Sequence, residues 1–241
     1  MAQNDLLAIG LYFGCIVAVG LPAILARVVF KIPFELLRKM YHMVITLSIF
    51  PLVTFFTHWY MAVLAAFLLV VIAYPLLARV ENAALYRRIA VERKTGEFKN
   101  SLIVVQASMA LLIFVFWGLL GPEWKYVAVV AVMAWGFGDA AAALIGKNFG
   151  RRRISHPRIE GTKTMEGTQA MFVTAGLAVF LTLLMYAGQS WPVSLAAALL
   201  VAPVCAVVEL FSQKGMDTLT VPITAGLAVL SVMSLFSYLG L

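Results

Sequence analysis

The chain has 241 residues, of which 63% are hydrophobic and 12% are charged, and its mean hydropathy is +0.98. No ordinary soluble domain has this balance, so we expect the lipid bilayer to be the solvent for most of the chain. The formal net charge of +7 suits an anionic neighbour, either lipid headgroups or a polyanionic ligand.

Long apolar runs predict the transmembrane helices. A helix rises about 1.5 Å per residue and needs about 20 residues to cross ~30 Å of hydrocarbon. The second run is short by itself, but a helix that begins near Pro33 would lengthen it at its polar end. We therefore predict an all-α, polytopic membrane protein with about eight transmembrane helices, forming a single domain over residues 1–241. The runs cover residues 5–26, 43–57, 60–78, 101–120, 126–145, 168–187, 192–211 and 220–239.

Lysine and arginine residues gather in alternate connections between these runs. The connections after the first, third, fifth and seventh runs hold 17 of the 18 Lys and Arg residues, and Lys125 alone lies on the other side. Cytoplasmic loops of membrane proteins are enriched in these residues. The sequence therefore predicts that these four connections lie in the cytoplasm and that both termini lie outside.

Two polar clusters come early in the chain. In the stretch FELLRKMYHMV, Glu35, Arg38 and His42 are spaced i, i+3, i+7 and share one helical face, with Lys39 beside them. This cluster is either an exposed helix end rich in charges or part of a functional site. The segment ERKTGEFKNSL then places Glu97 close to the membrane boundary. It is either a solvated connector or a contributor to the same site.

Four carboxylates lie near the cytoplasmic ends of the later predicted helices. Asp139 lies some six residues inside the end of the fifth run, and Glu209 lies near the end of the seventh. Glu166 and Asp217 open the sixth and eighth helices. Taken alone, each carboxylate could be a helix-end charge that reaches water, and Glu166 and Asp217 could simply favour a helix N-terminus. Their gathering beside dense cations predicts a shared site, because carboxylates are costly in the hydrocarbon region and usually mark function.

A site of this composition suits phosphoryl or nucleotidyl transfer. Mg²⁺ takes carboxylate oxygens and keeps substrate phosphates as further ligands, while Lys and Arg bind the remaining phosphate oxygens. The stretch from Trp135 to Thr168 supplies both halves, with Asp139 for the metal and Lys163 for phosphate. It is not a P-loop, because Ala141 stands where the first glycine should be.

Five blocks of sequence resemble a known family. They are ELLRKMYH, KTGEFKNSL, GDAAAALIGKNFG, GTKTMEGT and VELFSQKGMDTLTVP, between about residues 35 and 225. In this order they resemble the polyprenol kinase family, which includes dolichol kinase, phytol kinase and CTP-dependent diacylglycerol kinase. The resemblance implies a polytopic enzyme that moves a phosphoryl group from a nucleoside triphosphate, typically CTP, to a membrane-embedded alcohol. The matching positions are Arg38, Lys39, His42, Gly96, Glu97, Asp139, Gly146, Gly150, Lys163, Glu166, Gly167, Glu209, Asp217 and Pro222.

The last block departs from the family pattern and also bears on the alternatives. Family members often have DNLTVP there, where this chain has Thr218 in place of the asparagine, and threonine does not reproduce both amide hydrogen-bond roles. Phosphatidate cytidylyltransferases share the middle blocks, but their closing His-Gly-Gly run before two aspartates is missing here, which favours a kinase. A transporter of an anionic lipid or nucleotide is the other alternative. It is disfavoured because the motifs lie on one side and no inverted repeat is visible.

We therefore predict a CTP-dependent kinase for a membrane lipid alcohol such as a polyprenol or phytol, with its active site on the cytoplasmic side. Its expected partners are CTP, the lipid alcohol and the lipid bilayer, and we expect no nucleic-acid partner. Mg²⁺ is the expected cofactor, held by Asp139 with help from Glu209 or Asp217.

The remaining predicted roles follow from the same resemblance. Lys163, with Arg38 or Lys39, is expected to bind triphosphate oxygens. Glu209 or Glu97 is expected to accept the proton of the lipid hydroxyl. The other expected nucleotide-binding positions are His42, Gly146, Gly150, Glu166 and Gly167.

Overall fold

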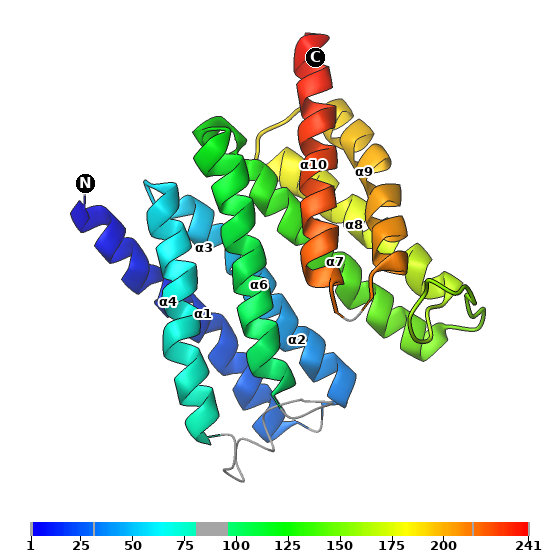
Figure 1. Cartoon of the computed structure of the whole chain (residues 1–241), viewed down its shortest axis with the longest axis horizontal. Helices are drawn as coiled ribbons and strands as arrows, with labels where there is room; N and C mark the ends of the chain where they lie inside the picture. Colours follow the sequence, from blue (N-terminus) through cyan, green and yellow to red (C-terminus); the bar gives the residue numbers. More distant parts are fainter. Residues whose placement is uncertain (1, 31, 81–95, 214, 241) are drawn as a thin grey trace. The chain divides into compact units, whose positions relative to one another are not determined.

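The computed structural model describes residues 2–30, 32–80, 96–213 and 215–240 (Figure 1). The chain divides into two compact units, Met1–Gly118 and Leu119–Leu241, and each is described by itself. Within the described ranges the regular structure is helical, and no strand is present beyond one isolated antiparallel bridge. The predicted all-α fold is therefore confirmed, while the single domain over residues 1–241 stays a prediction.

The polytopic membrane architecture is also confirmed. Eight helical segments of the described chain are long and apolar enough to cross a membrane. The position of both termini outside stays a prediction. The segments are Asn4–Arg27, Phe34–Thr54, Trp59–Val80, Glu97–Leu119, Pro122–Phe149, Met165–Met185, Trp191–Phe211 and Asp217–Tyr238.

In the residues described, unit 1 consists of α1 (Ala2–Val29), α2 (Phe34–Leu47), α3 (Ile49–Thr54), α4 (Trp59–Val80), α6 (Glu97–Ile113) and the π-helical η1 (Phe114–Leu119). Helix α1 packs against α2, α3 and α4, and α4 runs beside α6 (Figure 1).

The second span is broken at Ser48, whose hydroxyl donates to the Ile45 carbonyl at 2.6 Å. Pro51 explains the break, because proline lacks an N–H and its ring clashes with the carbonyl four residues earlier.

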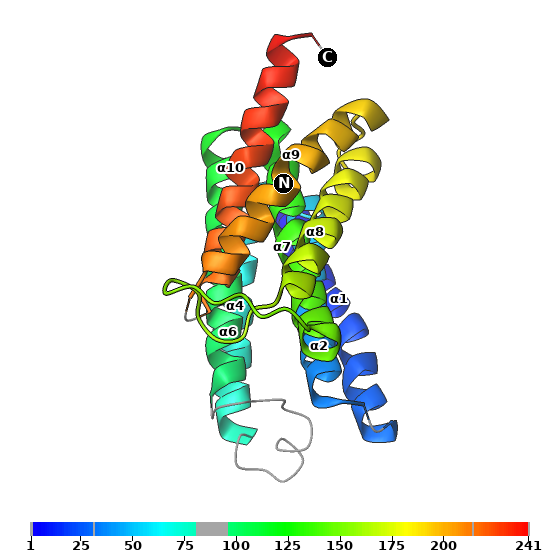
Figure 2. The ribbon, with the colours of Figure 1, turned by 90° about the vertical axis from the view of Figure 1, so that its right-hand side faces the viewer.

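Unit 2 begins with the short η2 (Pro122–Trp124), followed by α7 (Lys125–Phe149), α8 (Met165–Met185), α9 (Trp191–Phe211) and α10 (Asp217–Tyr238). Helix α8 packs against α7 and α9, and α10 packs against α9 and α7 (Figure 2). The four long helices therefore close a ring. Within α7, every residue from 127 to 136 is buried.

One end of unit 2 holds most of its charged residues. Short connections make successive helices antiparallel, so the ends of α7 and α9 lie at the same end as the beginnings of α8 and α10. We call the region formed by residues 139–167 and 209–220 the charged end. The carboxylates and cations predicted from the sequence for this part of the chain all belong to it.

Candidate active site

Asp139 lies well inside α7 and level with the interior of α8. Helix α7 continues to Phe149, beyond the apolar run at residues 126–145, so Asp139 precedes the helix end by about three turns. Its neighbour Gly138 packs on α8, since a Cβ there would lie 3.3 Å from the Ala175 Cβ. Asp139 is partly buried and lies level with the interior of α8 rather than with its first residue. A carboxylate at this depth in a membrane span usually marks function.

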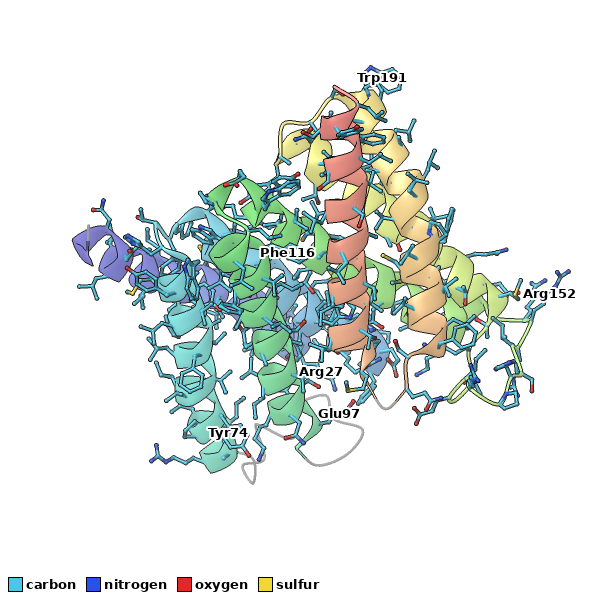
Figure 3. All side chains as sticks on the ribbon, turned by 45° about the horizontal axis from the view of Figure 1, so that its top comes forward. Arg27, Tyr74, Glu97, Phe116, Arg152 and Trp191 are labelled. Atoms are coloured by element: carbon cyan, nitrogen blue, oxygen red, sulfur yellow. The ribbon has the colours of Figure 1, made fainter. Side chains whose placement is uncertain are left out.

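The connection between α7 and α8, residues 150–164, holds most of the Lys and Arg residues of unit 2, and we call it the arginine loop. Two backbone hydrogen bonds close its base. The N–H of Ile154 donates to the Lys163 carbonyl, and the N–H of Met165 donates to the Arg152 carbonyl, both at 2.9 Å. Figure 3 shows Arg152 on this loop, where its side chain is exposed. The loop therefore presents cations from an ordered base.

Glu166, in the first turn of α8, fixes the backbone at the start of the arginine loop. Its carboxylate accepts hydrogen bonds from the N–H groups of Arg151 at 3.1 Å and Arg152 at 3.3 Å. Thr164 caps the same helix, with its hydroxyl accepting the N–H of Gly167 at 3.1 Å. The structure thus gives Glu166 a role in shaping the loop, while its predicted part in nucleotide binding stays a prediction.

Lys163 and Glu209 connect the beginning of α8 with the end of α9. The Lys163 ammonium donates to the Glu209 carboxylate and also to the main-chain oxygen of Glu209, at 3.0 Å for the latter. Glu209 is only 6% exposed. The Glu209 carbonyl lies in the last turn of α9, where it also accepts the N–H of Ser212 at 3.2 Å, and a cation is favourable at this end of a helix. The predicted phosphate-binding lysine and the predicted metal-binding carboxylate are therefore direct partners.

Three glycines of the predicted nucleotide-binding set allow α7 and α8 to approach closely. A Cβ on Gly167 would lie 3.0 Å from the Ala142 carbonyl oxygen and 3.3 Å from the Cα of Gly146. A Cβ on Gly150 would lie 2.6 Å from the Cγ2 of Thr164. These positions are required by packing, and their part in nucleotide binding stays a prediction.

Asp217 begins α10 at the charged end and is partly buried. The connection before it is short and is joined to α10 by a hydrogen bond. The hydroxyl oxygens of Ser212 and Thr220 lie 2.7 Å apart. Asp217 and Glu209 consequently belong to adjacent, hydrogen-bonded helix ends.

The carboxylate oxygens of the charged end are the type of ligand that Mg²⁺ takes. Within the ranges that the structure describes, no group of three or more His, Cys, Asp or Glu side chains lies close enough to hold a metal ion. Mg²⁺ does not need such a group, because it usually takes one or two carboxylates and completes its shell with water and substrate phosphates. Asp139 and Asp217 are partly buried carboxylates of this kind, and the carboxylates of Glu166 and Glu209 accept hydrogen bonds from Arg151 and Lys163.

The early cationic cluster lies on α2 in unit 1. Arg38 pairs with Glu35, with a nitrogen to oxygen distance of 3.0 Å, which confirms that the two share a helical face. Lys39 is 4% exposed, although the sequence placed it merely beside that face. His42 is partly buried on the same helix. Binding of triphosphate by Arg38, Lys39 or His42 stays a prediction.

Glu97 is the first residue of α6 (Figure 3). It follows Gly96, which has φ +81°, a left-handed conformation that glycine adopts without steric cost. Residues 92–95 of the predicted polar segment lie outside the described residues. A catalytic role for Glu97 stays a prediction.

Sequence reasoning missed the contact between the arginine loop and the end of α9. The side-chain amide of Gln213 donates to the Arg158 carbonyl at 2.7 Å, and the rings of His156 and Phe211 meet edge-on with centroids 5.8 Å apart. Its only trace in the sequence is a polar residue just after a transmembrane run. Such a residue is too common to be assigned a partner.

Comparison with known proteins found a similar curated protein. Over 133 residues the chain is 35% identical to a curated protein from Synechocystis sp. named phytol kinase. The chain is similar to a phytol kinase. The aligned stretch is 55% of this chain and 54% of the relative, so the chain spans about half the length of the curated relative that it matches. No protein-family model matches the chain. No solved structure matches it either.

Proposed function

We propose that the protein is a kinase that phosphorylates the hydroxyl group of a membrane lipid alcohol, with a nucleoside triphosphate, CTP by resemblance, as the phosphoryl donor. The observation that carries this proposal is the 35% identity to a phytol kinase over 133 residues. The eight membrane-spanning segments suit a lipid substrate. The cations of the charged end suit a polyphosphate.

In the proposed reaction the hydroxyl oxygen of the lipid attacks the γ-phosphorus. A bond forms between that oxygen and phosphorus, the bond from phosphorus to the β–γ bridging oxygen breaks, and the nucleoside diphosphate leaves. The hydroxyl proton passes to a carboxylate, for which Glu209 and Glu97 are the candidates. Catalysis of this kind depends mainly on positioning and charge neutralisation.

Lys163 is well placed to bind a phosphate oxygen. An ammonium group has three N–H donors, and Lys163 directs hydrogen bonds to the carboxylate and the carbonyl of Glu209. The third donor is then oriented by the other two. In this proposal Glu209 holds the ammonium group in position for the triphosphate.

The other residues of the proposal follow the resemblance. Asp139, with help from Glu209 or Asp217, would hold Mg²⁺, which neutralises phosphate charge when bound. In unit 1, Arg38, Lys39 and His42 would bind further phosphate oxygens. The location of the site on the cytoplasmic side follows from the distribution of Lys and Arg in the sequence.

Labelled nucleotide tests the proposal. Purified protein in detergent would be given CTP labelled separately at the α and γ positions, with phytol, farnesol, a long polyprenol or diacylglycerol. Only the γ label should enter the lipid, and CDP should accumulate. Recovery of the α label in the lipid with release of pyrophosphate would instead indicate a cytidylyltransferase. Absence of both labels from every lipid in the panel would contradict the proposal.

A further inference from the structure

The end of α9 contacts the arginine loop at both its base and its tip. At the base, it holds Lys163 through the ion pair described above. At the tip, Gln213 donates a 2.7 Å hydrogen bond to the Arg158 carbonyl. The His156 ring adds an edge-on contact with Phe211. The end of α9 therefore holds the loop that connects α7 and α8.

The tip needs such a contact for physical reasons. Ordering a loop costs conformational entropy, and Arg158 at the tip lies beyond the hydrogen bonds that close the base. The tip forms a turn of its own, in which the N–H of Ile159 donates to the His156 carbonyl at 2.9 Å and the N–H of Arg158 donates to the His156 Nδ1 at 3.2 Å. The Gln213 hydrogen bond joins this turn to the end of α9. The Gln213 amide binds a main-chain carbonyl and leaves the guanidinium group of Arg158 available for a ligand.

We propose that Gln213 is a positioning residue, which keeps the arginine loop in the arrangement that binds a polyphosphate group. It acts through the backbone of Arg158 and does not itself contact phosphate, and Phe211 supports the same tip through His156. The inference rests on the proposed function, in which the polyphosphate belongs to the nucleoside triphosphate.

Three variants of the full-length purified protein test this role. Gln213→Ala removes the donor without adding charge, and Gln213→Glu keeps the shape of the side chain but removes its N–H donors. The matched control is Gln189→Ala, in the connection between α8 and α9 at the other end of unit 2. The first readout is the rate of tryptic cleavage within the arginine loop. The second is the affinity for inorganic tripolyphosphate.

Both Gln213 variants should raise the cleavage rate by about two- to tenfold, the effect of losing one hydrogen bond. Gln213→Ala should weaken tripolyphosphate binding by a similar factor and raise the KM for nucleotide while kcat changes by less than about twofold. Gln189→Ala should match the wild type in every readout. The melting temperatures of all variants should agree, because Gln213 is exposed and Gln189 is only partly buried in a connection between helices.

Each other outcome has a definite meaning. A wild-type cleavage rate in Gln213→Glu would overturn the role of the donor. Faster cleavage in Gln213→Ala with unchanged tripolyphosphate affinity would mean that the contact orders the loop but does not affect polyphosphate binding. This result would overturn the inference. If the wild type phosphorylates no lipid with any nucleotide, the proposed function fails, while the cleavage and tripolyphosphate measurements still decide this inference.

Discussion

Lys163 and Glu209 join two helices of unit 2 through a single ammonium group, which donates to both the carboxylate and the main-chain carbonyl of Glu209. The carboxylate is almost fully buried, whereas the lysine side chain is about a quarter exposed. A buried charge without its partner is strongly destabilising. The lysine is therefore expected to serve stability as well as phosphate binding.

Lys163→Met and Lys163→Arg together test the roles of Lys163 in stability and in phosphate binding. Loss of the cation is expected to lower kcat/KM for the nucleotide by about 100-fold, as for other removed donors to transferred groups. It should also lower the melting temperature, because the Glu209 carboxylate loses its cation. Lys163→Arg keeps charge and donors, so it should preserve most of the stability. An unchanged kcat/KM in Lys163→Met would remove this residue from the site.

Asp139→Asn tests the deepest carboxylate of the charged end. The substitution keeps size and polarity but removes the charge that a Mg²⁺ ligand needs, so activity should fall by about 100-fold or more. The protein should still fold, because neutralising a charge within a membrane span does not hinder insertion. Glu123→Gln, at an exposed position outside the charged end, is the control. Near-normal turnover of a folded Asp139→Asn protein would exclude Asp139 from catalysis.

Gly167→Ala tests the close approach of α7 and α8. The added Cβ would lie 3.0 Å from a backbone oxygen, that of Ala142, which cannot move without shifting the helix. Overpacking of this kind should destabilise the protein by about 1–3 kcal/mol. Gly10→Ala on α1 is the control, since nothing lies within 4 Å of its Cβ and alanine favours helix. Equal melting temperatures of the two variants in detergent would argue against the packing role.

Hydropathy predicted the eight spans because each crossing must bury about 20 apolar residues, but it did not predict where helices break or end. The run at residues 43–57 has no charged residue to mark an interruption, and the break at Ser48 follows from Pro51. Helix α7 continues through Lys147 to Phe149, because a helix extends beyond the membrane without needing apolar residues. The predicted end at 145 therefore marked the apolar run and not the helix.

The sequence predicted which carboxylates gather at the charged end but not what they bind. Antiparallel helices bring Glu166 and Glu209 to one end, which follows from span order alone. Their partners depend on the packing angles and on the path of the arginine loop, which spacing along the chain does not encode. Only the structure therefore shows that Lys163 pairs with Glu209 and that Glu166 accepts backbone N–H groups.

Asp5 and His58 form a second buried carboxylate pair, far along the chain from the charged end. Asp5 is 1% exposed, lies 2.6 Å from the His58 Nδ1 and accepts the N–H of Thr57 at 2.8 Å. Asp5→Ala should destabilise the protein by about 1–3 kcal/mol, because it leaves these groups without an acceptor. Asp5→Asn keeps one oxygen acceptor and should cost less. Asn4→Ala, at the exposed neighbouring position, should leave the melting temperature unchanged, and equal effects of all three variants would contradict the pairing.

The predicted topology places the arginine loop in the cytoplasm and the connection between α8 and α9 outside, because 17 of the 18 Lys and Arg residues lie in alternate connections. Ser155→Cys in the loop and Gln189→Cys in the other connection test both sides, in a chain whose Cys15 and Cys205 are replaced by alanine. An impermeant thiol reagent added to intact cells should label only Gln189→Cys. Permeabilised cells should show labelling of both variants, which proves that the Ser155→Cys thiol is accessible. Labelling of Ser155→Cys from outside, with protection of Gln189→Cys, would invert the map and move the proposed site to the other side of the membrane.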